Sequence, residues 1–388
     1  MSGLHLGDFF ENRQEPGRAG LPVMSVTMND SLVLRDDMER RTESALRPEQ
    51  HLLVRKGDIA YNMMRMWQGA CGLAEADGIV SPAYVVLAPK PNIDSQFAYQ
   101  WFKSDRMVYL FWAYSHGLTE DRLRLYYEAF AEIPVSPPPL QEQQRIVAVL
   151  ETWDQAIAHT QKLVAAKHRR FRGMLTRFAA SHHNERVEFG ELVDLSSKKM
   201  QPGSIDAPDI SIELENLESE TGRIIGRSAV SADSALRSSF RAGDTLYGKL
   251  RPYLRKFARP EFDGICSTEI WVLRAKQKLL NEDLLFYLVQ TPEFEAAATK
   301  QSGSRMPRAD WDLVSATPVP CPRDKRKQKE AAALLDAALK SMWREQELLS
   351  ALKIQKRGLM QKMMNKDRLL DESRNLPLPR QLPALQQV

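Results

Sequence analysis

Lys56-Gly57-Asp58-Ile59-Ala60-Tyr61 is matched by Ala242-Gly243-Asp244-Thr245-Leu246-Tyr247, 186 residues further along the chain (57 to 243). At the same offset, Asp77-Gly78-Ile79-Val80-Ser81 matches Asp263-Gly264-Ile265-Cys266-Ser267, and matches recur without a gap to Arg122 and Arg308. Such a repeat decides the organisation of a chain before any local structure is assigned. Chance similarity between two mixed domains is the alternative, and a register this long and ungapped disfavours it.

The repeat continues beyond a short slip. Ile133-Pro134-Val135 corresponds to Thr317-Pro318-Val319, an offset of 184, and each is followed by prolines and a long helical pattern. The length of 388 residues fits two or three domains of roughly 100–200 residues each. We therefore predict two copies of one module, each an α+β domain followed by a long helix.

Within each domain, the pattern of apolar residues predicts strands and helices at equivalent places. Ile79–Leu87 and Ile265–Leu273 are predicted as strands, because β-branched and apolar residues follow Asp-Gly turns. Residues 96–110 and 282–298 are predicted as helices.

The long helices carry apolar residues in alternating steps of four and three, the heptad seam of a coiled coil with polar interruptions. The predicted seam residues are Ile146, Leu150, Trp153, Ile157, Val164, Phe171, Leu335, Met342, Leu349, Leu352 and Leu359. Each helix of about 40 residues would span roughly 60 Å. Since a lone helix of this kind cannot cover its seam, we expect the two to pair antiparallel, with the domains at opposite ends.

The predicted fold class is therefore α+β, with two tandem α/β domains separated by two long helices that form an antiparallel coiled coil. The expected boundaries are 1–138 for the first domain, 139–181 for the first helix, 182–322 for the second domain and 323–370 for the second helix. Residues 371–388, rich in proline and glutamine, are expected to form a flexible tail.

Bulk composition limits the function classes. The net charge of +4 is too small to indicate nucleic-acid binding by itself. Three widely spaced cysteines (Cys71, Cys266, Cys321) show no zinc spacing and fit reduced thiols in a cytoplasmic protein. We find no secretion-signal pattern at the start and no apolar run of about 18 residues, so neither export nor a membrane span is expected.

Catalytic and cofactor motifs are not found. Gly243–Lys249 fits the phosphate-loop spacing, but Leu250 stands where a magnesium-binding Ser or Thr is required. No nucleophile elbow, zinc-protease motif or adenine-methyltransferase motif occurs, and the seven histidines form no ligand cluster. The sequence therefore predicts a binding protein without a metal or cofactor of its own.

Basic and aromatic residues interleave between the matched strands, a pattern typical of nucleic-acid contact because Arg and Lys bind guanine or phosphate and Asn and Gln suit adenine. The alternative is a solvated hairpin with stacked side chains. In the second copy the candidates are Tyr247, Lys249, Arg251, Tyr253, Arg255 and Lys256, and in the first Asn62, Arg65, Trp67 and Gln68.

A second loop also recurs, with Ser115–Arg122 matching Gln301–Arg308. Glycine and small polar residues permit close approach to a phosphate or base, and Arg122, Ser302, Arg305 and Arg308 are the candidate contacts. An ordinary turn explains this loop equally well. Charge runs at 167–172 and 323–329 are interpreted as a solvated helix face or, alternatively, as contacts to phosphate or to an acidic partner.

Ile133–Ile146 joins a proline-rich stop to a Gln-rich helix start, and Leu352–Met364 ends the last helix. Together with the duplication, these features resemble the specificity (S) subunits of type I restriction-modification systems over residues 1–370. The second helix start departs from the family pattern, because Pro322-Arg323-Asp324-Lys325-Arg326-Lys327-Gln328-Lys329 replaces the usual Pro-Leu-x-Glu-Gln run.

The resemblance implies that each domain reads one half of a bipartite, asymmetric site in double-stranded DNA. It also implies that the helices set the spacer and dock two methyltransferase (M) subunits, which carry S-adenosylmethionine and methylate adenine. Endonuclease-translocase (R) subunits can join such complexes, and the S subunit itself is not catalytic. The competing hypotheses are a coiled-coil protein-interaction adaptor without DNA specificity and an enzyme with an unrecognised site.

Overall fold

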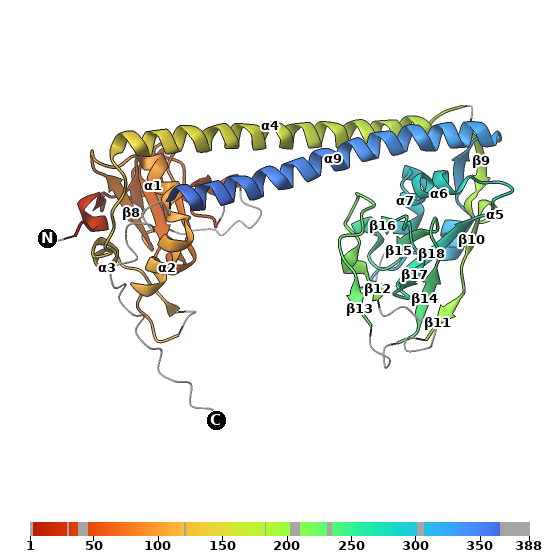
Figure 1. The fold of residues 1–388 in the computed structure, drawn as a ribbon, viewed down its shortest axis with the longest axis horizontal. Coiled ribbons are helices and arrows are strands. Elements are labelled where there is room, and N and C mark those ends of the chain that lie inside the picture. Colours follow the sequence, from red (N-terminus) through yellow and green to blue (C-terminus); the bar gives the residue numbers. More distant parts are fainter. Residues whose placement is uncertain are drawn as a thin grey trace, which may run out of the picture. The chain divides into compact units, whose positions relative to one another are not determined.

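The computed structural model describes residues 3–28, 31–37, 46–119, 122–182, 184–201, 210–230, 235–300 and 306–364. The chain divides into two compact units: unit 1 is Met1–His159 with Leu349–Val388, and unit 2 is Thr160–Leu348. The two long helices, α4 (Leu140–Ala179) and α9 (Lys325–Met364), each contribute to both units (Figure 1). Each unit therefore holds one mixed domain and part of each long helix. The predicted tail lies outside the described residues.

The central sheet has the same strand order in both units, β1-β8-β5-β6 in unit 1 and β10-β18-β15-β16 in unit 2, with all neighbours antiparallel. The strands of unit 1 are β1 (Phe10–Asn12), β5 (Ile59–Asn62), β6 (Cys71–Leu73) and β8 (Tyr84–Pro89). Those of unit 2 are β10 (Val193–Leu195), β15 (Thr245–Gly248), β16 (Phe257–Ala258) and β18 (Ile270–Ala275). Three of the four pairs begin 186 residues apart, and this confirms the predicted repeat.

Each unit has further sheets besides its central one. Unit 1 has β2 (Met24–Ser25) paired with β3 (Val33–Leu34), and β4 (Leu52–Val54) paired with β7 (Gly78–Val80). Unit 2 has a five-stranded sheet and the pair β9 (Glu185–Glu188) with β19 (Pro318–Cys321). The five strands in order are β11 (Lys199–Met200), β14 (Arg237–Phe240), β17 (Gly264–Cys266), β12 (Ile210–Ile212) and β13 (Ser228–Ala229).

The short helices also recur. Unit 1 has α1 (Ser95–Phe102), α2 (Asp105–Ala113) and α3 (Tyr127–Ala131), and unit 2 has α5 (Phe189–Leu192), α6 (Glu282–Leu288), α7 (Pro292–Thr299) and α8 (Trp311–Ser315). The 3-10 helices are η1 (Leu6–Asp8), η2 (Arg35–Asp37), η3 (Pro48–Gln50), η4 (Met66–Gln68), η6 (Leu214–Asn216) and η7 (Pro252–Leu254).

Two sequence predictions were too long. Each predicted single strand is a pair of strands in different sheets, β7 with β8 and β17 with β18, because the hydroxyl of Ser81 or Ser267 caps a turn between them. Each predicted domain helix is likewise two helices. Ser104 accepts a hydrogen bond from Met107 N and starts α2, and Pro292 begins α7, where a proline is favoured only in the first turn.

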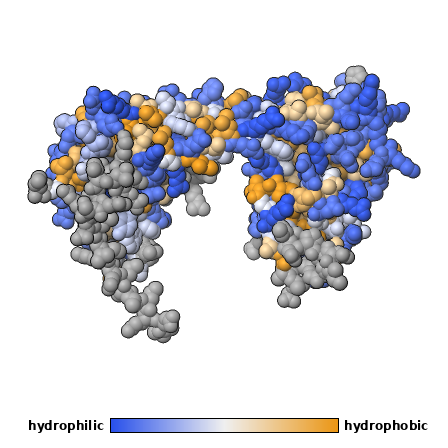
Figure 2. Space-filling model, viewed as in Figure 1, coloured by the Kyte–Doolittle hydropathy of each residue, from blue (hydrophilic) through white to orange (hydrophobic). Residues whose placement is uncertain are grey.

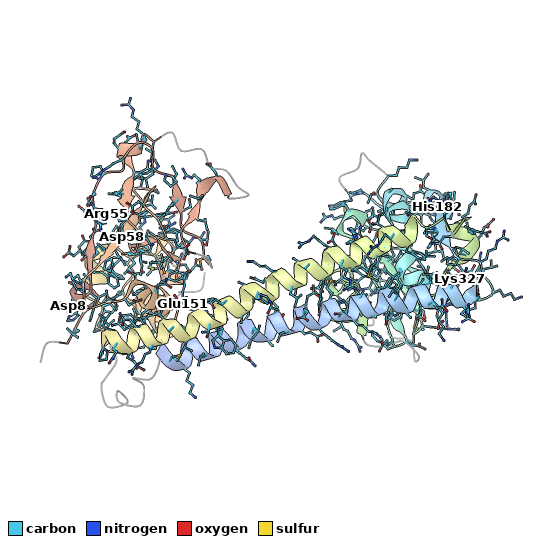
Figure 3. All side chains as sticks on the ribbon, turned by 90° about the horizontal axis from the view of Figure 1, so that it is seen from above. Asp8, Arg55, Asp58, Glu151, His182 and Lys327 are labelled. Atoms are coloured by element: carbon cyan, nitrogen blue, oxygen red, sulfur yellow. The ribbon has the colours of Figure 1, made fainter. Side chains whose placement is uncertain are left out.

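The matched Gly-Asp pairs build the same turn in both domains. Gly57 (φ +91°) and Gly243 (φ +86°) adopt the left-handed conformation that glycine accommodates at little cost. The next residue, Asp58 or Asp244, accepts the backbone N–H of Arg55 or Arg241 at 2.8 Å; Figure 3 labels Arg55 and Asp58. An arginine from a neighbouring strand region then pairs with each buried carboxylate, at 2.7 Å from Arg13 Nε to Asp58 and 2.8 Å from Arg274 Nε to Asp244.

In each unit the two long helices pack on each other and on the domain. In unit 1, Ile146 and Leu150 of α4 share a core with Met360 and Met364 of α9. In unit 2, Phe171 and Leu175 share a core with Leu335, Leu339 and Met342. As α4 advances, its partners on α9 come earlier in the chain, so the pairing is antiparallel. Apolar residues gather in these cores, and most of the described surface on the face drawn in Figure 2 is hydrophilic.

The predicted seam residues lie inward to different degrees. Ile146, Leu150, Phe171, Leu335 and Met342 are buried. The half-buried members are Trp153, Ile157, Val164, Leu349, Leu352 and Leu359. The heptad pattern missed Leu175 and Leu339, because helices that pack on a domain as well as on each other bury a wider stripe than a coiled-coil seam.

The polar interruptions of the seam form ion pairs between the helices. Lys167 Nζ lies 2.7 Å from Glu345 Oε1 and 2.9 Å from Ser341 Oγ in unit 2. Lys356 Nζ lies 2.6 Å from Asp154 Oδ1 in unit 1. Polar partners within an apolar seam favour one register of the two helices.

A buried glutamine near the start of each long helix fastens it to its domain. Gln143 Oε1 accepts Asp94 N at 2.8 Å, while its Nε2 donates to Pro138 O at 2.8 Å. Gln328 makes the equivalent bonds to Asn281 N at 2.7 Å and Pro322 O at 2.8 Å. The glutamine therefore joins three parts: the proline stop, the long helix and the residue before a domain helix.

We predict that Gln143→Ala destabilises unit 1 by about 2–4 kcal/mol, because it leaves three partly buried backbone groups without this partner. The measurement is the denaturant midpoint of the full chain. Gln144→Ala, one residue along and exposed, is the matched control and should stay within about 0.5 kcal/mol of the parent protein. Equal midpoints for the two variants would contradict the fastening role.

The three cysteines are free and buried. Burial raises the pKa of Cys71 and of Cys321 to about 11 and that of Cys266 to about 12. We predict that iodoacetamide at pH 8 alkylates the folded protein at least about 100-fold more slowly than the unfolded protein, because the thiolate is the nucleophile. Mass spectrometry against time measures this, and rapid labelling of any one cysteine in the folded state would contradict it.

Candidate nucleic-acid interface

One connection carries most of the candidate residues in each unit. Turn 1 (residues 62–70) links β5 to β6, and turn 2 (residues 248–256) links β15 to β16. Each contains a 3-10 helix at the same offset of 186 residues, η4 in turn 1 and η7 in turn 2. The structure therefore presents Arg65 and Arg251, and likewise Trp67 and Tyr253, at equivalent positions of equivalent turns.

The described residues at or just after the end of the second predicted loop lie beside the turn in both units. In unit 1, Leu125 N donates to Met63 O at 3.0 Å. In unit 2, Ala309 N donates to Lys249 O at 2.8 Å and Arg251 N donates to Pro307 O at 2.8 Å. The end of the second loop thus joins turn 2 in unit 2, and the segment that follows the second loop joins turn 1 in unit 1. Arg122 is exposed on its loop, whereas Ser302 and Arg305 lie outside the described residues.

Tyr247 is not part of this surface, and its prediction as a DNA contact was wrong. Its side chain is 1% exposed and packs against Trp271 and Phe294, with ring centroids 6.1 and 5.0 Å away. Burial raises the pKa of its hydroxyl far above the usual value. Tyr61, at the equivalent position of unit 1, is also fully buried, so this tyrosine belongs to the scaffold of the repeat.

Three of the predicted cations in unit 2 are held by neighbouring acceptors. Arg255 pairs with Glu220 at 3.0 Å and with Glu295 at 2.6 Å. Lys256 Nζ donates to the backbone of Leu214 at 2.7 Å. Arg308 makes two hydrogen bonds to Glu269, at 3.0 and 3.2 Å, and this carboxylate raises the pKa of its guanidinium.

The other candidates of turn 2 face outward. Arg251 and Tyr253 are exposed, and the side chain of Tyr253 keeps 57% of its accessible surface. Lys249 is half-buried. Within the described ranges, neither Lys249 nor Arg251 has a side-chain hydrogen bond or ion pair, so their donors are available to a ligand.

Turn 1 satisfies more of its own polar groups. Asn62 Oδ1 accepts Met64 N at 3.0 Å, and Trp67 Nε1 donates to Met64 O at 3.0 Å. Arg65 Nη1 donates to Gln68 Oε1 at 3.2 Å. The exposed groups of this turn are therefore the remaining donors of Arg65 and the Met64 thioether.

A set of ion pairs that the sequence did not reveal braces turn 2. Glu295 of α7, which binds Arg255, also accepts two hydrogen bonds from Arg172 of α4, at 3.0 and 3.2 Å. Glu220, the other partner of Arg255, lies in a hairpin whose Thr221 O accepts Trp343 Nε1 of α9 at 3.0 Å. Turn 2 is thus tied to both long helices within unit 2. Only tertiary contacts reveal this, because the six residues come from five separate places along the sequence.

The described part of the chain contains no group of three or more His, Cys, Asp or Glu side chains arranged to hold a metal ion. Nor does it contain a helix with the length and apolar character needed to cross a membrane.

Residues 30–166 match the model of the type I restriction modification DNA specificity domain. Over 140 residues the chain is 29% identical to the type I restriction enzyme EcoDI specificity subunit of Escherichia coli, covering 35% of this chain and 30% of that protein. The chain thus spans less than a third of the length of that curated relative.

Solved structures share the fold over most of the chain. The type I restriction-modification S subunit from M. genitalium covers 93% of this chain and 95% of its own, with a TM-score of 0.54 and 14% identity. A chain from a structure on complex assembly and conformational transition of the type I R-M system covers 94% and 97%, with a TM-score of 0.57 and 16% identity.

The duplicated domain and the paired long helices therefore have the fold of these solved structures. The model of the type I restriction modification DNA specificity domain matches the greater part of the first domain and the start of α4. The resemblance found in the sequence is confirmed.

We predict that Arg255→Ala lowers the local stability of turn 2 by about 1–3 kcal/mol, because it removes two charged hydrogen bonds that are only partly exposed. Amide hydrogen exchange of residues 249–256 measures the effect. Arg308→Ala, which removes an exposed pair from the same surface, should change the exchange of turn 2 by less than about 1 kcal/mol. If the two variants changed the hydrogen exchange of turn 2 equally, the ion pairs of Arg255 would not stabilise the turn specifically.

Proposed function

We propose that this chain is the DNA sequence-specificity subunit of a type I restriction-modification complex, in which each domain reads one half of a bipartite, asymmetric DNA site. The observation that carries this proposal is that the two domains share a strand order and a turn position but differ in the residues on that turn. Equal scaffolds with different turns give two readers of different sequences, whereas identical domains read palindromes.

In this proposal exposed and half-buried residues of both turns and of the adjoining loops contact the DNA. Lys249, Arg251, Tyr253 and Arg308 act for the second domain, and Asn62, Arg65, Trp67, Gln68 and Arg122 act for the first. Arg255 and Lys256 are proposed as positioning residues, since their side chains are held by Glu220, Glu295 and Leu214.

The long helices are proposed to dock two methyltransferase subunits. Large apolar side chains remain exposed on both helices, namely Val149, Leu163, Leu334, Leu348 and Ile354. Val149 and Leu163 are two heptads apart, as are Leu334 and Leu348, so each pair lies on one face of its helix. Hydrophobic residues also break the hydrophilic surface of the helices in Figure 2. An exposed apolar face of this kind is typical of a protein interface.

Catalysis is assigned to the partners. The methyltransferase subunits would bind S-adenosylmethionine and methylate adenine, and endonuclease-translocase subunits would join for restriction. The chain itself would contribute recognition and spacing. The coiled-coil adaptor without DNA specificity is less favoured, because the family match falls on a DNA specificity domain.

The test is to co-express the chain with its cognate methyltransferase subunits and to map methylated adenines in the host genome. We predict methylation at a bipartite motif with a fixed spacer. Replacing residues 1–135 by the corresponding domain of another family member should change one half of the motif only. A change in both halves, or in neither, would contradict the two-reader proposal, and methylation without sequence preference would favour the adaptor.

A further inference from the structure

Turn 2 offers hydrogen-bond donors to a ligand, whereas the carboxylates beside it already pair with arginines. The acidic side chains beside it, Glu220, Glu269 and Glu295, each hold an arginine within unit 2. Lys249 and Arg251 have no side-chain partner among the residues that the structure describes. Since Lys and Arg are donors without acceptor atoms, these two side chains can bind only acceptors.

The backbone that carries these two side chains is fixed on both sides. Lys249 N donates to Glu269 O at 2.9 Å, while Lys249 O accepts Ala309 N at 2.8 Å. Arg251 N donates to Pro307 O at 2.8 Å, and Pro252 restricts the next backbone angle. A ligand therefore has to order only the side chains, which lowers the cost of a specific contact.

Among the base pairs of DNA, guanine best matches a pair of donors. In the major groove it presents two adjacent acceptors, O6 and N7, and Arg or Lys can bind both. Adenine places an amino donor beside N7, thymine offers O4 beside a methyl group, and cytosine presents an amino donor. A pair of side chains that offers only hydrogen-bond donors therefore favours guanine over the other three bases.

Turn 1 offers fewer cationic hydrogen-bond donors to a ligand than turn 2. Met63 and Met64 stand where turn 2 has Lys249 and Leu250, so turn 1 has no cation at the position of Lys249. The oxygens of Asn62 and Gln68, which a two-bond contact with adenine would need, already accept hydrogen bonds inside the turn. The contrast therefore assigns the stronger guanine requirement to the second domain.

We propose that Arg251, together with Lys249, reads a guanine in the half-site recognised by the second domain. This inference rests on the proposed function and adds the base that one of the two readers selects. A phosphate is the other acceptor of the same chemistry, and it carries no sequence information. The experiment must therefore separate a loss of preference from a uniform loss of affinity.

The test uses the complete complex with its methyltransferase subunits and duplexes built on the mapped motif. Each base pair of the second domain's half-site is replaced in turn, and Kd is measured for the parent complex and for Arg251→Ala. In the parent, replacement of one guanine should weaken binding by about 5- to 150-fold. In the variant, that penalty should fall to within about 2-fold, while the penalties at the other positions persist.

Two controls accompany this variant. Arg241→Ala removes an exposed arginine of the same domain outside turn 2 and should leave every base preference unchanged. Arg65→Ala removes the equivalent residue of turn 1 and should leave the second half-site unchanged. A parallel experiment with Lys249→Ala should reduce the same guanine penalty without affecting other positions.

The outcomes separate the two levels of the hypothesis. A bipartite motif without guanine in the second domain's half, or a guanine penalty that survives Arg251→Ala, would overturn the assignment and leave the specificity function standing. A uniform loss of affinity for all sequences, with the salt dependence reduced by about one phosphate contact, would assign Arg251 to the backbone and overturn it as well. No bipartite methylation in the parent complex would overturn the proposed function and the assignment together.

Discussion

The rest of the structure depends on one hydrogen-bonded side chain, the buried glutamine near the start of each long helix. Gln143 and Gln328 bind the proline stop and the capping residue of a domain helix through the same amide group. Because a buried amide must satisfy both its donor and its acceptor, it fixes position and direction more strictly than apolar contact does. The second helix start has exchanged its neighbouring residues for lysine and arginine but keeps this glutamine. Attachment to the domain and the charge of the outer helix face are therefore separate properties of the same short segment.

A fixed attachment allows the turns to diverge. Turn 1 has Gly69 in the left-handed conformation, and turn 2 has Arg255 at the equivalent position with φ +50°. An L-residue other than glycine costs about 1–2 kcal/mol in that conformation. The ion pairs of Arg255 with Glu220 and Glu295 offset this cost, and they come from a hairpin and a helix outside the turn. Turn 2 thus depends on residues far away in the sequence, so transplanting the turn alone would not transfer its conformation.

The sequence predicted the parts that repetition and periodicity encode. The matched Gly-Asp turns fixed the position of β5 and β15, and the heptad seam located α4 and α9 to within a few residues. The sequence prediction merged two elements into one where an apolar run contains a polar residue, as at Ser81 and Ser104. A single side-chain cap can end an element within a continuous hydrophobic pattern. Of the candidate site, the paired turns and loops could be found by comparing the two copies. The burial of Tyr247 could have been anticipated, since Tyr61 repeats it and shared residues belong to the scaffold. The roles of Glu220, Glu295 and Arg172 could not, because no local pattern connects them.

The brace also links recognition to the helices. Turn 2 reaches α4 through Glu295 and Arg172, and it reaches α9 through Glu220, Thr221 and Trp343. Any partner that shifts one helix against the other within unit 2 would therefore strain the turn, and a bound base that fixes the turn would favour one arrangement of the helices. Such coupling is reciprocal by thermodynamic necessity. Under the proposed function, the turn that selects a base is thus joined to the helices that dock the partner subunits by a few ion pairs and one indole hydrogen bond. Under the proposed function, a change of charge in the brace would alter the base preference although the brace residues do not contact the DNA.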